Sequence, residues 1–400
     1  MSHSPLPLTA PLPLSILDLS PIRAGGTVSE AFRNTVDLAQ RAEAAGYARY
    51  WLAEHHFAPG VAGAAPAVLI GHVAGATRTI RVGAAAVQTG HHTPLAIVEQ
   101  FGILDALFPG RIDLGLGRSG QRREEAIAEL AAGSEAADRP EPRARVVDGL
   151  LIPKPFSFTS LLATSRLKYL YAHLQQPGAV SPAYTEQVDE ILGLLGGTLR
   201  ADDGGPFTAV PGTGADVEVW VFGSSRGESA RVAGERGLPF GANYHVSPAT
   251  VLEAIDAYRD AFRPSARLER PHVAVSADVV VADDEATARR LASPYGLWVR
   301  SIRTGQGAMP FPTPEDAAAH VWSEADRELV ADRIDTQFVG TPESVAEQLA
   351  VLAGVTGADE LVVTTITHDH ADRVRSFELL AAEWSAPRRV RADAPVGSPR

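Results

Sequence analysis

The sequence predicts an α/β fold and, within that class, a TIM (β/α)8 barrel with insertions in the loops that follow its strands. Short apolar runs that suit strands alternate with helix-like runs about eight times along the 400 residues. Strands that are apolar throughout belong to a parallel sheet covered by helices. We see no linker that would separate two cores, and about eight strand–helix units is the number that closes such a barrel. An open, doubly wound sheet is the alternative that the same alternation allows.

The first part of the chain alternates strands and helices without interruption. In the first expected helix, Phe32, Val36 and Ala39 recur at helical spacing, while Ser29 can cap its start and Gly46 its end. The strands are expected at residues 12–20, 48–57, 79–88 and 111–120, and the helices at residues 27–46, 65–77 and 93–110.

The second part contains two irregular regions, at about residues 121–216 and 293–336. We interpret both as insertions in strand–helix loops of a single domain over residues 12–385, with flexible tails at 1–11 and 386–400. One helical patch, YTEQVDEILGLL, lies inside the first insertion. The other elements expected here are strands at 217–225, 238–245, 272–284 and 360–367 and helices at 227–237, 248–262, 341–354 and 370–384.

Composition argues against several classes of function. The formal net charge is -12 at pH 7, and the only dense basic run is Arg388, Arg389 and Arg391, so nucleic-acid binding is not expected. The absence of cysteine removes disulfides, thiolate nucleophiles and cysteine-ligated metals. The proline-rich start MSHSPLPLTAPLPLS matches neither a signal peptide nor a membrane segment, and no later run is long and apolar enough to span a bilayer. A soluble cytoplasmic protein is therefore expected.

The stretch YWLAEHHF, residues 50–57, places an acid and two histidines at the end of an apolar strand. In a barrel, function collects at the C-terminal ends of the strands, and this position favours a catalytic His55. A histidine that is merely hydrogen-bonded at a strand end is the alternative. No metal site is expected, because zinc needs three or four converging ligands and His55 and His56 would face opposite sides of a continuing strand.

Two further strand ends suit a ligand with a phosphate group. In VWVFGSSRGESA, Gly223 permits a tight turn, and Ser224 and Ser225 stand where a helix begins. Helix N-termini attract anions, but serine there more commonly caps the helix, so both interpretations stay open. In DLGLGRSG, the match to a dinucleotide-binding glycine motif is weak because no acidic residue follows at the expected distance. The same loop can present Arg118 to an anion, or Arg118 is a surface residue beside a turn.

A third strand, RVGAAAVQ, contains three adjacent alanines where larger side chains would be expected in a barrel. Small side chains at this position let a flat ligand approach the backbone closely. Tight packing of the alanines against a large neighbour is the alternative.

Taken together, these motifs resemble those of the bacterial-luciferase-like flavin-dependent monooxygenases. Matching segments occur in the same order along the chain, between Leu14 and Trp384, and the match is weakest in the two insertions. The GSS turn is most similar to that of the bacterial luciferase-like oxidoreductases, rather than the alkanesulfonate or nitrilotriacetate types. The sequence departs from luciferase itself in GRSG and in the insertion that follows, so light emission is not inferred. The segments that carry the resemblance are YWLAEHHF, IRVGAAAVQTGHHTPLAIVEQFGILDALFPGRIDLGLGRSG, VWVFGSSRGESARVAGERGLPFGANYH and FVGTPESVAEQLAVLAGVTGADELVVTTITHDHADRVRSFELLAAEW.

The resemblance implies a TIM-barrel enzyme that uses reduced FMN and O2 to oxygenate a small organic substrate through a flavin peroxide. His55 corresponds to the family's catalytic histidine beside the flavin, and Arg118 corresponds to the arginine that pairs with the FMN phosphate. Ala85 and Ala86 match a pair joined by a cis peptide bond beneath the isoalloxazine ring. The phosphate-binding turn of the family falls on Gly223, Ser224 and Ser225.

The resemblance also implies a homodimer and a separate flavin reductase that supplies reduced FMN. The nearest alternative is a deazaflavin (F420)-dependent hydride-transfer oxidoreductase of the same fold, although the GSS turn and the EHH motif favour FMN. A non-catalytic flavin-binding homologue and a partner subunit of a heterodimer are further alternatives. The presence of both His55 and Arg118 argues against the partner subunit. In the second insertion, Tyr295, Trp298 and Phe311 are expected to line an apolar substrate pocket or to form the core of a lid.

Overall fold

The computed structural model describes residues 11–118, 143–156, 169–170 and 172–386. Its main sheet contains eight barrel strands: β1 (Leu14–Asp18), β2 (Arg49–Leu52), β3 (Arg81–Gln88), β4 (Ile112–Gly117), β7 (Glu218–Gly223), β8 (Phe240–Asn243), β9 (Val273–Val281) and β11 (Glu360–Thr364). All neighbouring strands pair in parallel in the order β9-β11-β1-β2-β3-β4-β7-β8, and β8 pairs with β9 to close the ring. The predicted TIM barrel is confirmed. The open doubly wound sheet is wrong, because closure leaves none of these eight strands at an edge.

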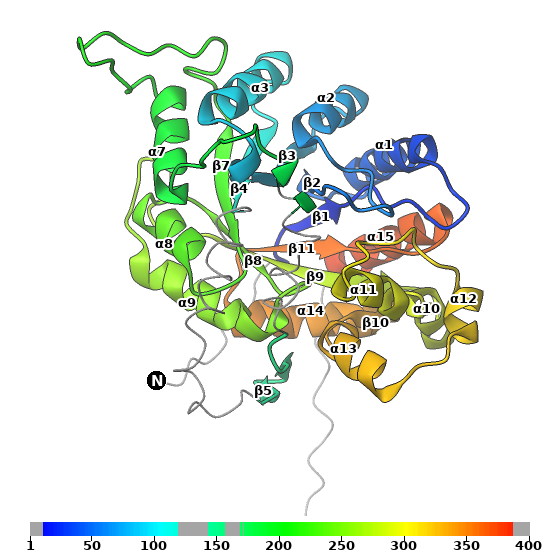
Figure 1. Cartoon of the computed structure of the whole chain (residues 1–400). Helices are drawn as coiled ribbons and strands as arrows, with labels where there is room; N and C mark the ends of the chain where they lie inside the picture. The colour runs from blue at the N-terminus through cyan, green and yellow to red at the C-terminus, as the bar shows by residue number, and fades with distance from the viewer. Residues whose placement is uncertain (1–10, 119–142, 157–168, 171, 387–400) are drawn as a thin grey trace, which may run out of the picture.

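Helices surround the barrel on its outside (Figure 1). The helices that follow the eight strands are α1 (Val28–Ala44), α2 (Pro66–Ala76), α3 (Pro94–Leu107), α7 (Tyr184–Leu195), α8 (Glu228–Glu235), α9 (Val251–Ala261), α14 (Pro342–Thr356) and α15 (His370–Ser385). None of the helices that the structure describes is long and apolar enough to cross a bilayer. The predicted tails at 1–11 and 386–400 fall almost wholly outside the described residues, as does the basic run at 388–391.

Both insertions contain regular structure. The first, between β4 and α7, contains an antiparallel hairpin of β5 (Arg145–Val147) and β6 (Leu150–Ile152), while its residues 119–142 and 157–168 lie outside the described part. The second was expected to be irregular, and this expectation is wrong, because capped helices occupy most of it. Thr313 and Ser323 accept hydrogen bonds from backbone amides at two of their starts. Its helices are α11 (Tyr295–Arg303), α12 (Pro314–Ala319) and α13 (Glu324–Asp335). On either side of it lie α10 (Glu285–Ala292) and the short strand β10 (Phe338–Gly340), which pairs with β9.

Two local predictions need correction. Thr27, not Ser29, caps α1: Thr27 has an extended backbone and its side chain accepts from the amide of Glu30, whereas Ser29 already lies inside the helix. The strand predicted over 48–57 ends at Leu52, so the EHH motif lies in the loop that follows β2. Strand alternation therefore does not separate His55 from His56, and that part of the argument against a metal was wrong.

The apolar side chains form two main layers. An outer layer packs the strands against the surrounding helices, with Tyr50, Phe101 and Phe240 among its fully buried members. An inner layer fills the barrel, where Trp51 and Trp220 meet edge to face with ring centroids 5.5 Å apart. The inner layer continues into the second insertion through Trp298 and Phe311. Its buried members are Leu17, Leu19, Trp51, Ala53, Val61, Trp220, Ala274, Tyr295, Trp298, Val299, Ala308, Phe311, Val330, Val362 and Ile366.

Glycines make room for the large rings inside the barrel. A Cβ on Gly83 would lie 2.6 Å from the ring of Trp51, and one on Gly115 would overlap the carbonyl oxygen of Ala84 and the ring of Phe222. Neither neighbour can move freely, because both belong to barrel strands or fill the barrel interior. Close packing of this kind tolerates little extra volume.

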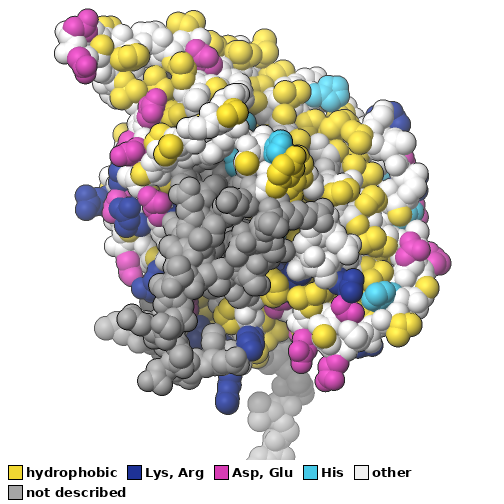
Figure 2. Space-filling model, viewed as in Figure 1, with side chains coloured by type: hydrophobic (Ala, Val, Ile, Leu, Met, Phe, Trp, Pro, Cys, Tyr) yellow, Lys and Arg dark blue, Asp and Glu magenta, His cyan; other side chains and the backbone are white. Residues whose placement is uncertain are grey.

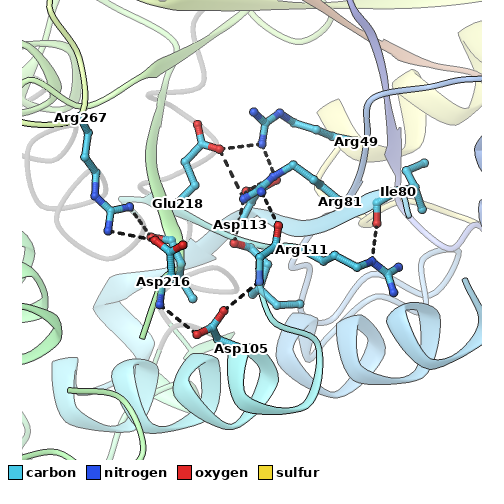
Figure 3. A network of polar contacts seen from close by, with 12 residues as sticks. Arg49, Ile80, Arg81, Asp105, Arg111, Asp113, Asp216, Glu218 and Arg267 are labelled. Atoms are coloured by element: carbon cyan, nitrogen blue, oxygen red, sulfur yellow. Dashed lines mark hydrogen bonds and ion pairs between the residues drawn. The ribbon is translucent and has the colours of Figure 1, made fainter. Parts of the chain in front are cut away.

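A network of buried charges closes the N-terminal end of the barrel (Figure 3). The guanidinium of Arg49 contacts Asp113 at 2.6 Å, Glu218 at 3.1 Å and Glu360 at 3.2 Å. Burial alone would lower the pKa of Arg49, but the attraction of the three carboxylates raises it. Arg81 adds a second cation on Asp113. Each of these residues is the first or second of its strand, so the network joins five strands at one end.

We predict that Gly115→Ala destabilises the protein, because the new methyl group has no space beside Ala84 and Phe222. Overpacking a core in this way costs about 1–3 kcal/mol. The free energy of unfolding, measured by urea titration, should fall by that amount. The matched control is Gly354→Ala in α14, where nothing lies within 4 Å of the added Cβ. Alanine is the better helix former, so this control should be neutral or slightly stabilising. Equal stability of the two variants would contradict the packing argument.

Candidate active site

A cavity of about 520 Å³ lies at the C-terminal ends of the barrel strands. This is the end at which barrel enzymes place their active sites. The walls come from the loops after several strands and from the second insertion, and they are mostly apolar: Leu17, Leu19, Ala53, Val61, Trp298 and Ile366 are among them. The polar residues that converge on the cavity include Glu54, His55, His56, Gln88, Arg118, Asn243, His245, Asp278, Gln306 and Arg333. An apolar cavity with a few converging polar groups is typical of a small-molecule site.

Four of the predicted site residues line this cavity, namely His55, Ala85, Ala86 and Arg118. They come from the ends of three consecutive strands, β2, β3 and β4, which pair side by side. The peptide bond between Ala85 and Ala86 is cis, as the resemblance implied. The sequence therefore identified residues that lie far apart in the chain and close together in space.

The predicted turn after β7 lies beside the cavity and does not line it. A Cβ on Gly227 would lie 3.2 Å from Nη2 of Arg118 and 3.3 Å from Oγ of Ser225, so these two side chains approach the same backbone position. Ser224 uses its carbonyl oxygen to accept a hydrogen bond from the hydroxyl of Thr250.

Gly223 has a packing reason to be glycine. A Cβ on Gly223 would lie 3.0 Å from both the ring of Phe240 and Cβ of Ser229, which is tighter than most real contacts. The residue therefore permits β7 to run close to β8 and to the first turn of α8.

The start of α8 and the buried Arg118 together form an electropositive corner. Gly227 is the N-cap residue and supplies no side chain to bind the first amides of the helix. The Arg118 side chain is only 8% exposed and lies 3.3 Å from the carboxylate of Glu228. Glu228 also accepts from the hydroxyl of Thr185 at 2.9 Å. A buried guanidinium beside an uncapped helix N-terminus suits an anion such as phosphate, with which Glu228 would compete.

Glu54 organises the loops after β2 and β3. Its Oε1 lies 2.8 Å from Nε2 of His56 and 3.0 Å from Nε2 of His92, and its Oε2 accepts from the amide of Gln88 at 2.9 Å. Burial would raise the pKa of Glu54, but these hydrogen bonds outweigh it and lower the pKa to about 2. A carboxylate that is ionised and fully paired holds its neighbours in place, so Glu54 fixes the loop that carries His55.

His55 and His245 are neutral side chains at neutral pH. Burial lowers the pKa of His55 to about 4, and the charge of His56 adds to this effect. Among the residues that the structure describes, the buried Nδ1 of His55 has no hydrogen-bond partner. Burial also lowers the pKa of His245 to about 3, with a further contribution from the charge of Arg333. Nδ1 of His245 lies 2.7 Å from the hydroxyl of Ser276, which fixes the ring.

Three residues form a buried polar cluster at the wall made by β9 and the second insertion. The hydroxyl of Tyr295 donates a hydrogen bond to Asp278, and Nη2 of Arg333 lies 3.5 Å from the same carboxylate. Nε of Arg333 donates to the Tyr295 hydroxyl at 3.0 Å. Burial raises the pKa of Asp278, against the attraction of Arg333. The predicted aromatic residues of this insertion divide their roles: Trp298 lines the cavity, while Tyr295 and Phe311 pack behind it.

Four polar residues of the cavity have no role predicted from the sequence, namely Glu54, His245, Asp278 and Arg333. Glu54 and His245 follow predicted strands, and Asp278 is an acid within the apolar run VAVSADVVV, which is a usable signal. Arg333 lies in α13, far from any strand end, and no sequence signal distinguishes it from other arginines on helices. Among the described residues, no group of three or more His, Asp or Glu side chains is arranged to hold a metal ion.

The chain is similar to one protein family over most of its length. The sequence model of that family, described as luciferase-like monooxygenase, matches residues 12–360. The Bacillus subtilis (strain 168) protein YvbT is 38% identical over 93% of this chain and 96% of its own length. A luciferase-like monooxygenase of Escherichia coli (strain K12) is 34% identical over 91% of this chain and 95% of its own length. The crystal structure of apo-MsnO8 has a TM-score of 0.73 at 28% identity and covers 94% of this chain and 100% of its own.

More distant solved structures share the fold and differ in cofactor. The oxygenating component of 3,6-diketocamphane monooxygenase from Pseudomonas putida, a type II Baeyer-Villiger monooxygenase in complex with FMN, has a TM-score of 0.60 at 19% identity. It covers 94% of this chain and 98% of its own. An F420-dependent secondary alcohol dehydrogenase has a TM-score of 0.57 at 12% identity and covers 94% of this chain and 99% of its own. At these identities the likeness concerns the barrel alone.

We predict that His245 makes the protein less stable in acid. Its pKa is about 3 in the folded chain against an ordinary value of 6.5, so the unfolded chain binds an extra proton between these pH values. The free energy of unfolding should therefore fall as the pH drops below 6.5, by up to about 1.4 kcal/mol per pH unit. His245→Asn should remove this contribution and reduce the loss between pH 7 and pH 5 by about 2 kcal/mol.

The measurement is urea unfolding at several pH values, and the quantity compared is the slope with pH rather than the stability at one pH. His72→Asn is the matched control, because His72 is exposed on α2. This control should keep the slope of the wild type. An unchanged slope in His245→Asn would show that His245 is not held neutral by burial.

Proposed function

The chain belongs to the luciferase-like monooxygenase family, and from that premise we propose that it uses reduced FMN and O2 to oxygenate a small organic substrate. The main support is that His55, Ala85, Ala86 and Arg118, from three neighbouring strand ends, line a single apolar cavity. We further propose that one barrel domain, over residues 12–385, contains this whole site.

The residues present fit FMN. The buried Arg118 and the uncapped start of α8 would hold the phosphate, with Ser224 and Ser225 beside them in the turn after β7. The small side chains of Ala85 and Ala86 leave space for a flat ring against β3. When bound, reduced FMN supplies the electrons that activate O2.

His55 is the proposed catalytic residue. Because the pKa of His55 is lowered to about 4, its imidazole is unprotonated at neutral pH and can accept a proton from a reacting group and return it. The pKa of Glu54, lowered to about 2, keeps that carboxylate ionised at neutral pH, so it retains its hydrogen bonds to His56 and Gln88 beside His55. Leu19, Trp298 and Ile366 keep the cavity apolar, which excludes water from the reaction.

The proposal includes two partners. A separate flavin reductase in the cytoplasm would supply reduced FMN. A second copy of the chain would form a homodimer through α2 and α3, where apolar side chains point outward. Figure 2 shows hydrophobic side chains gathered over these helices, at the top of the view. The exposed members are Val68, Leu95, Ile103 and Leu107. Exposed apolar patches on soluble proteins mark protein interfaces.

We predict that Arg118→Ala weakens FMN binding and leaves riboflavin binding unchanged. Riboflavin lacks the phosphate, so only FMN loses a charge-assisted contact, which is worth about 1.5–3 kcal/mol or roughly tenfold or more in affinity. His55→Ala should keep FMN affinity. Mixed with air, bound reduced FMN in the wild type should give an absorbance transient that free FMN lacks, and His55→Ala should lose it. Anaerobic titration followed by stopped-flow absorbance measures both effects.

The matched control for Arg118→Ala is Arg231→Ala, since Arg231 pairs with Glu235 on the exposed side of the same helix, α8. It should bind both flavins as the wild type does. Equal loss of FMN and riboflavin in Arg118→Ala would contradict the phosphate assignment. Binding of reduced deazaflavin, with no transient on exposure to air, would assign the chain to hydride transfer instead. Flavin binding with turnover unaffected by His55→Ala would favour a non-catalytic binding protein.

We predict that the double variant Ile103→Glu/Leu107→Glu is monomeric. The two residues are 50% and 65% exposed on α3, and charges there would have to be buried in the dimer. Light scattering at micromolar concentration should give a dimer for the wild type and a monomer for the variant. Val321→Glu is the control, because Val321 is 89% exposed and belongs to the loop between α12 and α13, not to α2 or α3. A monomeric wild type, or a variant that still dimerises, would exclude this interface.

A further inference from the structure

One cation of the cavity takes no part in the phosphate contacts or in the proton transfer proposed above. Arg333 lines the cavity from α13 in the second insertion, and it is nearly fully buried. It pairs with Asp278 of β9, whereas Arg118 of the proposed phosphate corner follows β4. Arginine is costly to bury, so a buried arginine that faces a cavity calls for a ligand or a structural reason.

The neighbours of Arg333 hold its guanidinium in one orientation. Nε donates to the hydroxyl of Tyr295 at 3.0 Å, and Nη2 contacts the same hydroxyl and the carboxylate of Asp278. The guanidinium also lies 5.4 Å from the ring centre of Tyr295. These contacts use one edge of the planar group, so the other edge is preorganised and the side chain loses little freedom when it binds a ligand.

This arrangement leaves the third nitrogen, Nη1, available to a ligand. In the part of the chain that the structure describes, Nη1 of Arg333 makes no hydrogen bond, whereas Nε and Nη2 make three. Since Arg333 lines the cavity, the donors of Nη1 suit an oxygen atom of a bound molecule. His245, whose pKa is lowered partly by the charge of Arg333, lies within electrostatic range of the same place. The charge of His55 also contributes to the lowered pKa of His245, so a group bound there is near the proposed catalytic histidine.

The charges nearby decide which kind of oxygen fits. Asp278 offsets the charge of Arg333, and burial keeps His245 and His55 neutral, so this wall offers hydrogen-bond donors with little net positive charge. A carboxylate would bring an unpaired negative charge into a buried site, which is unfavourable. Its bidentate contact is also disfavoured, because Tyr295 occupies Nε and Nη2 is shared by Tyr295 and Asp278, which leaves Nη1 as the one nitrogen without a protein partner in the described part of the chain. A neutral carbonyl oxygen needs only the single donor group that remains.

We propose that Arg333 is a specificity-determining residue, whose Nη1 donates to the carbonyl oxygen of a neutral substrate such as a ketone, an aldehyde or an amide. The inference deepens the proposed function, because it names the substrate class of the same cavity. Arg333 binds and orients the substrate, while His55 accepts and returns the proton of the reacting group.

The test compares three small probes of similar shape by ligand-observed NMR: acetophenone, its isostere α-methylstyrene, in which CH2 replaces the carbonyl oxygen, and benzoate. In Arg118→Ala, which lacks the guanidinium of the phosphate corner, acetophenone should bind more tightly than benzoate. Arg333→Met should lower the affinity ratio of acetophenone to α-methylstyrene by about tenfold or more, the worth of a hydrogen bond to a charged group. Comparison of ratios removes the difference in hydration between the two probes.

Arg333→Met leaves the charge of Asp278 unpaired and could fail to fold. The double variant Asp278→Asn/Arg333→Met removes both charges and should show the same fall in the ratio. Arg303→Met is the matched control, because Arg303 is also a buried arginine of the second insertion, pairs with Asp332 and stacks on Phe156 at 3.9 Å, but does not line the cavity. Its ratio should equal that of the wild type.

Two results would overturn the proposal. One is an unchanged ratio in a folded Arg333 variant, and the other is tighter binding of benzoate than of acetophenone by Arg118→Ala, in which the phosphate corner lacks its guanidinium. The probes are measured without flavin and without turnover. A chain that fails to bind FMN therefore contradicts the proposed function and leaves the probe result standing, whereas normal FMN binding with an unchanged ratio contradicts only the assignment of Arg333.

Discussion

The barrel depends most on the ion pairs that the buried guanidinium of Arg49 makes at its N-terminal end. This guanidinium lies among carboxylates from three other strands, at 2.6 Å from Asp113, 3.1 Å from Glu218 and 3.2 Å from Glu360. Removal of one member of such a group leaves buried charges unpaired, which typically costs several kcal/mol. The same guanidinium stacks 4.9 Å above Trp220, the ring that begins the inner core. The N-terminal end is therefore closed by charge and aromatic packing together.

A rigid N-terminal end makes it possible for the opposite end to carry long loops. The inner core passes from Trp51 and Trp220 upward to Leu19 and Ile366, and these last two line the cavity. The loops above them depend on local hydrogen bonds more than on the barrel. Glu54 is the clearest case, since it joins the loop after β2 to the loop after β3 through His56, His92 and Gln88. The place of His55 is thus set by a neighbour that has no direct part in the chemistry we propose.

The sequence predicted the barrel well because apolar strands and amphipathic helices are local patterns. All eight strands lie where they were expected, and α7 coincides with the run YTEQVDEILGLL. Errors arose where tertiary contacts decide. The strand predicted over 48–57 ends at Leu52, and Glu54 beyond it binds side chains and an amide of neighbouring loops, which are tertiary contacts that periodicity cannot foresee. The second insertion was called irregular although its helices are capped, because their patterns are short and polar.

The residues of the candidate site also divide into those that local motifs predicted and those that only tertiary contacts bring together. His55, Ala85, Ala86 and Arg118 sit in motifs that a resemblance can transfer. Asp278, Tyr295 and Arg333 belong to a cluster that forms only when α11 and α13 fold over β9, and nothing local marks it. The insertion that carries most of this cluster is also where the resemblance was weakest. Recognition of the substrate is therefore the part of the function that a sequence alone predicts least.

The cavity places two arginines in an apolar environment and pairs each with a carboxylate. Arg118 lies 3.3 Å from Glu228, and Arg333 lies 3.5 Å from Asp278. The two pairs differ in what they leave for a ligand. Arg118 stands beside the open amides of α8, so a phosphate there gains a helix terminus as well as a guanidinium and can outcompete Glu228. Arg333 has no such support and its carboxylate partner is locked by Tyr295, so that wall favours a neutral acceptor. One cavity can thus bind an anionic cofactor at one wall and an uncharged substrate at another.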